Sequence, residues 1–233
     1  MKPFIRNLSA PAEFCIVILL CFGVPLLFGS VLVVVRHLMH VAQPQAHFNN
    51  GTVLRMLIWQ LVTFVVVLWL GHIRGWSLAT LGMRVSWKST GMGVLLYVAA
   101  TVVAVLVHRY MAAHTFRPGT RPLAIVTTGL TLPFILLNSA TNPLFEETFE
   151  AGYVIRSLQG FGMWPAILAG ALLRAALHAY LGISVVVTVF ATGVIFGLVY
   201  WRGRQLWPLV VAHALLDFLG LLHVDILRLL PVN

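Results

Sequence analysis

The chain has 233 residues, of which 60% are hydrophobic and 9% are charged, and its mean hydropathy is +0.96. A soluble domain is about one quarter charged, so this composition excludes an ordinary soluble protein and predicts an integral membrane protein. The net charge of +9 does not indicate nucleic-acid binding, because the basic residues fall singly or in small groups between apolar runs and form no aromatic-interleaved patch.

Seven apolar segments are long enough to cross a bilayer as helices. In chain order they are Phe14–Val35, Val53–Ile73, Gly91–Ala113, Leu123–Phe145, Trp164–Leu181, Ile183–Trp201 and Leu206–Leu222. Backbone groups in lipid need internal hydrogen-bond partners, and no alternating-strand pattern points to a barrel. The sequence therefore predicts an all-α fold, a polytopic transmembrane helical bundle of about seven spans.

The basic residues between the spans also bear on orientation. If the N-terminus is cytoplasmic, eight of them lie inside and six outside, a small excess that favours this orientation in the inner or plasma membrane. The inside set is Lys2, Arg6, Arg74, Arg84, Lys88, Arg156, Arg202 and Arg204, and the outside set is Arg36, Arg55, Arg109, Arg117, Arg121 and Arg228.

Ionisable residues gather within or beside the spans of the C-terminal half. They occur in NPLFEETFEAG at the end of the fourth span, in ALLRAALHAYLG of the fifth and in PLVVAHALLDFLG of the seventh. A single charge near the bilayer centre costs about 2.5–3.5 kcal/mol, so these groups are tolerable only if they converge in the bundle interior. The predicted site residues are Glu146, Glu147, Glu150, Arg174, His178, His213 and Asp217.

Helical spacing supports one polar site, because three pairs are separated by four residues and so lie on one face of their helices. The pairs are Glu146 with Glu150, Arg174 with His178, and His213 with Asp217. Four carboxylates face one arginine, so some carboxylates are protonated, a histidine is cationic, or a divalent cation binds.

Structural interpretations stay open beside the functional one. Each histidine could be only an interhelical hydrogen-bond donor. Asp217 could pair only with His213 along its own helix, and Glu150 could belong to a solvated helix end.

The three motifs resemble the CAAX-protease and bacteriocin-processing (CPBP) family of intramembrane proteases, also called the Abi family. The motifs are EETFEAGY at 146–153, a helical histidine at His178 and HALLD at 213–217. GVIFGLVYWRGRQLWPLVVAHALLDF at 193–218 is similar to the closing segment of that family. The chain is thus interpreted as one membrane-embedded domain, residues 1–233, with motif-free spans over 13–121 and a family-like core over 122–224.

The resemblance implies a hydrolase that cleaves a peptide bond of a peptide or protein in or at the membrane. Glu146 would activate water as general base, and His178 would position that water or bind metal. His213 and Asp217 would stabilise the oxyanion or complete a metal site. The predicted catalytic residues are Glu146, Glu147, His178, His213 and Asp217, supported by Arg174 and Glu150. If a divalent metal such as zinc is bound, as in a metalloprotease, its ligands would be Glu146, His178 and His213, and a metal-free mechanism is the alternative.

Two positions depart from the family pattern. The family motif EExxxR would place arginine at 151, where this chain has Ala151, and FxxxH would place phenylalanine at the position of Arg174. We hypothesise that Arg174 supplies the missing cation by pairing with Glu147 or Glu150. Two alternatives to a protease remain: a non-catalytic family member acting as membrane scaffold or immunity protein, and an ion or proton-coupled transporter. The sequence names no substrate and does not indicate whether substrates are prenylated.

Overall fold

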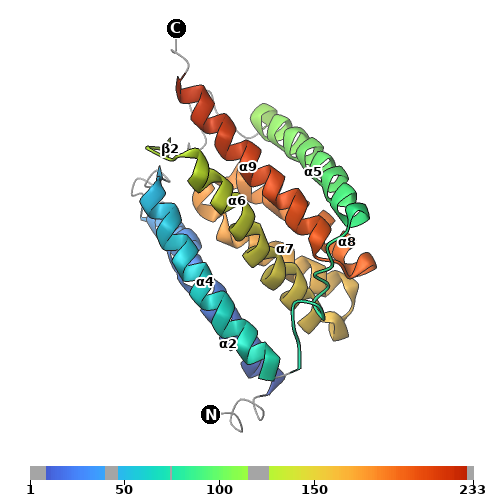
Figure 1. Cartoon of the computed structure of the whole chain (residues 1–233). Helices are drawn as coiled ribbons and strands as arrows, with labels where there is room; N and C mark the ends of the chain where they lie inside the picture. Colours follow the sequence, from blue (N-terminus) through green and yellow to red (C-terminus); the bar gives the residue numbers. More distant parts are fainter. Residues whose placement is uncertain (1–8, 40–46, 74, 115–125, 230–233) are drawn as a thin grey trace.

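Helices occur at all seven predicted places in the computed structural model, which describes residues 9–39, 47–73, 75–114 and 126–229 (Figure 1). The long helical elements are α2 (Ala10–Leu26), η1 (Leu27–Val31), α3 (Leu32–Leu38), α4 (Asn50–Ile73), α5 (Trp87–His114), α6 (Leu132–Glu146), η2 (Glu147–Ile155), α7 (Met163–Leu177), α8 (Ile183–Gly203) and α9 (Trp207–Leu229). Two short 3₁₀ turns, η3 (Gln159–Phe161) and η4 (Ala179–Leu181), complete them. The predicted all-α bundle is confirmed.

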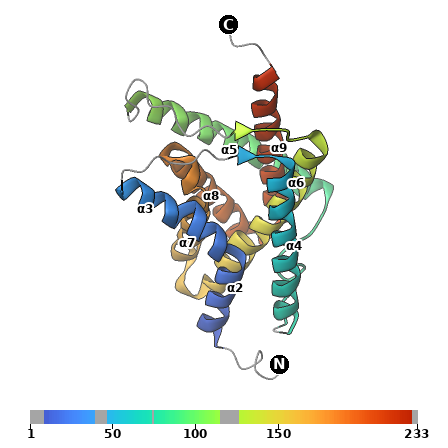
Figure 2. The ribbon, with the colours of Figure 1, turned by 90° about the vertical axis from the view of Figure 1, so that its left-hand side faces the viewer.

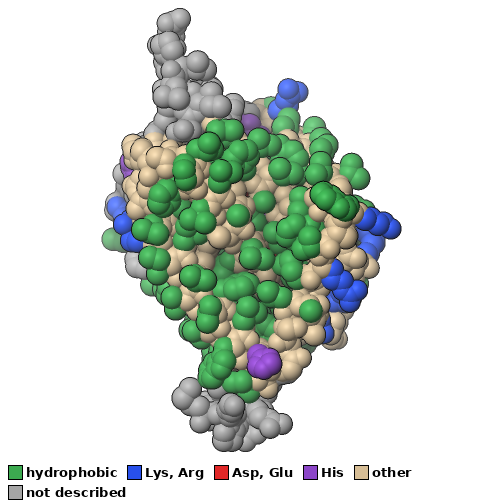
Figure 3. All heavy atoms as spheres, viewed as in Figure 1, with side chains coloured by type: hydrophobic (Ala, Val, Ile, Leu, Met, Phe, Trp, Pro, Cys, Tyr) green, Lys and Arg blue, Asp and Glu red, His purple; other side chains and the backbone are tan. Residues whose placement is uncertain are grey.

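The outer surface of the bundle suits a lipid environment. Three helices, α4, α5 and α8, are both long and apolar enough to cross a membrane, and shorter apolar helices cover Ala10–Leu26, Met163–Leu177 and Trp207–Leu222. Hydrophobic side chains such as Leu61 and Leu95 are exposed. They cover most of the face seen in Figure 3, where Lys and Arg lie towards the margins.

Orientation stays a prediction, because several residues on which it depends lie outside the described part of the chain. These are Lys2, Arg6, Arg74, Arg117 and Arg121.

The helices form a closed circuit around one buried segment. Each contacts the next in the order α5, α9, α6, α4, α2, α7, α8 and back to α5 (Figure 1, Figure 2). The segment η2 contacts α6, α7 and α8, and all of its residues are buried. The three acids of the sequence motif therefore lie at, or directly before, the most enclosed stretch of the molecule.

Close approach of α7 to α8 depends on glycine. A Cβ at Gly197 would lie 2.7 Å from Ile167 Cγ2, and one at Gly193 would lie 3.1 Å from Ala171 Cα. Small residues at helix interfaces are the usual means by which membrane helices approach closely. The Gly-rich face of α8 therefore brings α7, which carries Arg174, into the bundle interior.

Two helices contain wide, π-helical turns that follow an internal proline. Pro25 precedes η1, and Pro143 precedes η2. Proline lacks an amide N–H and its ring displaces the carbonyl four residues earlier, which opens the regular hydrogen-bond ladder. The predicted fourth span is corrected at both ends, since α6 begins at Leu132 and the helix continues through η2 to Ile155. Leu123, its predicted start, lies outside the described residues.

A short extended pair replaces the start of that predicted span. Strand β1 (His47–Phe48) pairs in parallel with β2 (Val126–Thr127). The backbone N–H of Thr131 donates to Asn50 Oδ1 at 3.0 Å, which joins the start of α6 to the start of α4. This link fixes α4 beside α6, and the space between these two helices adjoins the site described next.

Candidate active site

The acidic motif, Arg174 and His213 converge in the bundle interior. Glu147 and Glu150 are 0% and 1% exposed, so Glu150 does not belong to a solvated helix end. Arg174 reaches them from α7 and His213 from α9, and both are buried. Three separated pieces of chain therefore meet at one polar cluster, and the catalytic roles assigned to these residues stay predictions.

Arg174 is the cation for two carboxylates. Its Nη2 atom lies 2.5 Å from Glu147 Oε1 and 2.8 Å from Glu150 Oε2. The guanidinium carbon also lies 5.3 Å from the ring centroid of Phe196, a cation–π distance. The ion pairs predicted for Arg174 are therefore present with both acids. Whether they replace an arginine at position 151 stays a hypothesis.

The wide turn changes which acids act together. Four-residue spacing predicted Glu146 and Glu150 on one helical face, but a π-turn does not keep the 3.6-residue period on which that expectation depends. Glu147 and Glu150 instead share Arg174, while Glu146 faces His213. The motif thus separates into two neutralised acids and one further acid.

His213 lies among carboxylates on both sides of its ring. Its Nδ1 atom is 2.7 Å from Glu147 Oε1, and its Nε2 atom is 3.4 Å from Asp217 Oδ1 and 3.8 Å from Glu146 Oε2. An ionised carboxylate only accepts hydrogen bonds, so both ring nitrogens are placed to donate. Asp217 therefore contacts its helix neighbour as one structural interpretation predicted, and that contact is part of the larger cluster.

Glu146, unlike Glu147 and Glu150, borders the cavity that His178 also lines. Its Oε2 atom is buried and, in the described part of the chain, has no hydrogen-bond partner. The adjoining cavity measures about 130 Å³ and is also lined by His178, Tyr180 and Asn142. A space of this size and polarity can hold water.

His178 follows α7 at the edge of the same cavity. Its Nδ1 atom lies 2.9 Å from the Arg174 carbonyl oxygen. A carbonyl oxygen only accepts, so Nδ1 carries the hydrogen and Nε2 is left as the acceptor in the neutral ring. The local fold therefore sets the tautomer of this histidine.

Two amide side chains complete the cluster, and sequence reasoning missed both. Asn142 Nδ2 donates to Asp217 Oδ2 at 3.1 Å, and Gln60 Nε2 donates to Asn142 Oδ1 at 2.6 Å. Asn142 is four residues before Glu146, a spacing that could have identified it. Gln60 is a buried amide in an apolar stretch of α4, within the spans predicted to lack a motif.

The predicted metal ligands are not assembled as a metal site. Within the ranges that the structure describes, no three His, Cys, Asp or Glu side chains are placed to hold an ion. His213 has carboxylates at both ring nitrogens, and Nδ1 of His178 is hydrogen-bonded to a carbonyl. We derive no step through a metal, and zinc binding stays a prediction.

Residues 128–219 match the model of a protein family described as type II CAAX prenyl endopeptidase Rce1-like. The resemblance to CAAX-type intramembrane proteases is therefore confirmed over this part of the chain. No curated protein and no solved structure gives a significant match to the chain. The matched range contains all of the predicted site residues, but Gln60 lies outside it.

Proposed function

We propose that this protein is an intramembrane endopeptidase that hydrolyses a peptide bond with a water molecule activated by Glu146. The match of residues 128–219 to a family of prenyl endopeptidases supports the reaction class. The observation that carries the assignment is the position of Glu146 beside the 130 Å³ cavity, where its Oε2 atom has no hydrogen-bond partner among the described residues. A general base must have a free lone pair within reach of the water from which it takes a proton.

The contrast between adjacent glutamates supports this choice of base. Arg174 lies 2.5 Å and His213 Nδ1 lies 2.7 Å from Glu147 Oε1, so the charge of Glu147 is already compensated. Hydrogen bonds to a carboxylate weaken it as a proton acceptor. Glu147 therefore acts as a positioning residue that holds Arg174 and His213, and Glu146 acts on water.

The proposed reaction follows general acid–base chemistry. Glu146 accepts a proton from water while the water oxygen bonds to the scissile carbonyl carbon, and the carbonyl oxygen becomes an oxyanion. His213 Nε2–H, which faces this side of the cluster, stabilises the oxyanion by donating a hydrogen bond. Glu146 then returns the proton to the leaving amine as the C–N bond breaks. His178, with Nε2 as acceptor, orients the water before attack.

The apolar surface of the bundle and its basic residues support proposals for the class of substrate and for the membrane location. The substrate is a peptide or protein in or at the bilayer, because the catalytic cavity lies within a bundle whose outer surface is apolar. The proposed location is the inner or plasma membrane with a cytoplasmic N-terminus, in line with the excess of basic residues on that side.

The test is cleavage of a peptide library by purified protein and by the Glu146→Gln variant. We expect Glu146→Gln to lower turnover by about 10²–10⁴-fold, the range typical of general-base removal, without changing detergent stability. Ser139→Ala is the matched control, because its hydroxyl donates within α6, to the Ile135 carbonyl oxygen at 2.8 Å. Full turnover by Glu146→Gln would remove the assigned base.

The same experiment separates the two alternatives. A non-catalytic scaffold or immunity protein would cleave no library peptide, and its cellular phenotype would survive Glu146→Gln. A transporter would instead move ions across liposome membranes without any cleavage.

A further inference from the structure

We propose that the apolar groove between α4 and α6 binds the substrate peptide beside its scissile bond, and that Gln60 accepts a hydrogen bond from a peptide backbone N–H. This inference rests on the proposed function, and it names a substrate-binding surface whose α4 wall, including Gln60, lies outside the family-matched range.

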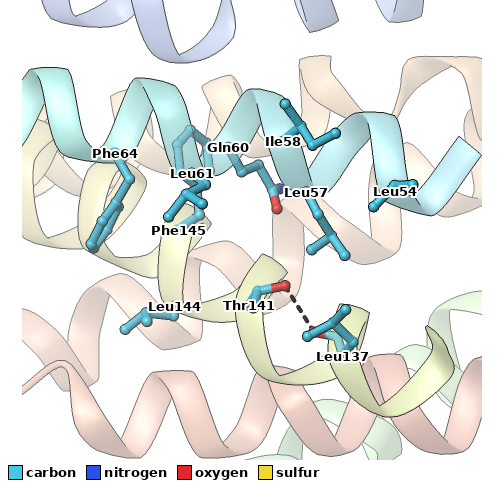
Figure 4. A pocket seen from close by; sticks show the side chains of 10 residues that line it. All are labelled: Leu54, Leu57, Ile58, Gln60, Leu61, Phe64, Leu137, Thr141, Leu144 and Phe145. Carbon is cyan, nitrogen blue, oxygen red and sulfur yellow. Dashed lines mark hydrogen bonds between the residues drawn. The ribbon is translucent and has the colours of Figure 1, made fainter. Parts of the chain in front are cut away.

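The groove is large and almost entirely apolar. It measures about 330 Å³, and five leucines, Ile58 and two phenylalanines line it. Figure 4 shows these side chains converging from the two helices, with Leu57 and Leu61 of α4 opposite Leu137 and Leu144 of α6. Such walls suit apolar side chains of an occupant.

Two polar side chains also line the groove, and their hydrogen bonds differ. The Thr141 hydroxyl donates to the Leu137 carbonyl oxygen at 2.8 Å, within its own helix. Gln60 is only 7% exposed, and its carboxamide points from α4 into the space between the helices (Figure 4). Gln60 Oε1 has no hydrogen-bond partner in the described part of the chain.

The orientation of the Gln60 amide follows from the residues behind it. Asp217 is a carboxylate and accepts, so Asn142 must present its NH₂ group to Asp217. Asn142 then presents its oxygen to Gln60, which must donate from Nε2. The remaining atom, Oε1, is therefore an acceptor that needs a donor from another molecule.

An occupant must match the apolar walls and also donate one hydrogen bond. A peptide with apolar side chains does both, because each of its residues other than proline carries a backbone N–H. A lipid acyl chain or a polyisoprenoid chain fits the walls but has no donor. The unpartnered acceptor therefore favours a peptide over a hydrocarbon chain.

The groove also leads to the proposed catalytic residue. Gln60 and Phe145 line both the groove and the 130 Å³ cavity, and Glu146 lines that cavity. A peptide held in the groove therefore ends at the water that Glu146 activates. The chain Gln60–Asn142–Asp217 connects the same contact to His213.

The experiment measures binding separately from turnover. A short fluorescein-labelled peptide of leucine and alanine is titrated against the Glu146→Gln protein in phosphatidylcholine nanodiscs, with anisotropy as readout. Esters then replace the peptide amides one at a time, which removes each N–H in turn. We expect the ester at one position to weaken binding roughly tenfold, because one buried hydrogen bond to Gln60 is lost. In the Gln60→Met variant, esters at all positions should have the same small effect on binding.

A steric variant tests the location of the peptide. Leu137→Trp fills the groove with a larger side chain. The peptide then loses its apolar contacts there, so its dissociation constant should rise at least tenfold. Leu95→Trp is the matched control, because Leu95 is 67% exposed on α5, away from the groove.

Each outcome bears on the inference. It would be overturned if the Gln60→Met variant showed the same ester effects as the protein that keeps Gln60, or if Leu137→Trp left peptide binding unchanged. Displacement of the labelled peptide by squalene, a polyisoprenoid hydrocarbon without a hydrogen-bond donor, but not by the unlabelled peptide would assign the groove to a hydrocarbon chain and also overturn the inference. Normal cleavage by Glu146→Gln would defeat the proposed general base, yet it would leave the binding result intact.

Discussion

Arg174→Met should destabilise the protein strongly, because it removes the cation that two buried carboxylates share. Glu150 would lose its ion pair at 2.8 Å, and Glu147 would keep His213 at 2.7 Å. Removing one partner of a buried ion pair costs about 3–5 kcal/mol. The two pairs share one guanidinium, so their costs do not add, and we expect a loss of about 3–5 kcal/mol in the free energy of unfolding.

Two further variants separate charge from geometry. Arg174→Lys keeps the positive charge but loses the planar fork, so its unfolding free energy should lie between those of wild type and Arg174→Met. The double variant Arg174→Met/Glu150→Gln removes the orphaned charge together with its partner and should regain part of the loss. A third test exchanges the family residues: Arg174→Phe should regain stability when Ala151→Arg is added, if Arg174 replaces the cation at position 151.

The assay is reversible unfolding in mixed micelles of increasing dodecyl sulfate content, followed by far-ultraviolet circular dichroism. Arg202→Met is the control, because Arg202 is exposed at the end of α8 and should change stability by less than about 0.5 kcal/mol. If Arg174→Met also stayed within about 0.5 kcal/mol of wild type, the idea that Arg174 holds the two acids together would be wrong.

Three other predictions follow from the site and the packing around it. Asn142→Leu removes the donor to Asp217 at 3.1 Å and should reduce turnover more than substrate binding, measured as a fall in kcat with a smaller change in KM. Gly93→Ala should cost about 1–3 kcal/mol, because its Cβ would lie 2.6 Å from Val211 Cβ, whereas Gly91→Ala, with nothing within 4 Å, should not destabilise. Chelation should abolish activity and added zinc should restore it if Glu146, His178 and His213 bind a metal, whereas unchanged activity after chelation would favour the metal-free mechanism.

Much of the fold followed from the apolar runs because lipid permits few alternatives to the helix. The runs ending at Ile73 and Trp201 correspond closely to α4 and α8. The fourth span was misplaced for a local reason. Sequence hydropathy falls at Glu146, which suggested a span end, whereas the helix continues through η2 because its acids are neutralised by partners from other helices. Hydropathy alone contains no information about such distant partners.

The sequence predicted the charged residues of the candidate site but not the neutral ones. Charged residues in a membrane are costly enough to draw attention wherever they occur. An amide such as Gln60 is less conspicuous, and its role depends on a partner, Asn142, that is 82 positions away in the chain. The different roles proposed for Glu146 and Glu147 could not be predicted from the sequence either. Adjacent residues of one type differ only in the residues that surround them in the fold.

The wide turn after Pro143 explains how adjacent glutamates obtain those different surroundings. A regular helix would have continued from Glu146 with four-residue spacing, so that Glu146 and Glu150 would face the same neighbour. Because the π-turn begins at Glu147, Glu147 and Glu150 both reach Arg174 on α7, and Glu146 stays at the end of α6 beside Asn142 and the cavity. Such turns inside α-helices are frequently found at functional sites. The local break in helical period therefore places Glu147 and Glu150 against Arg174 and leaves Glu146 beside the cavity, with Oε2 3.8 Å from His213 Nε2.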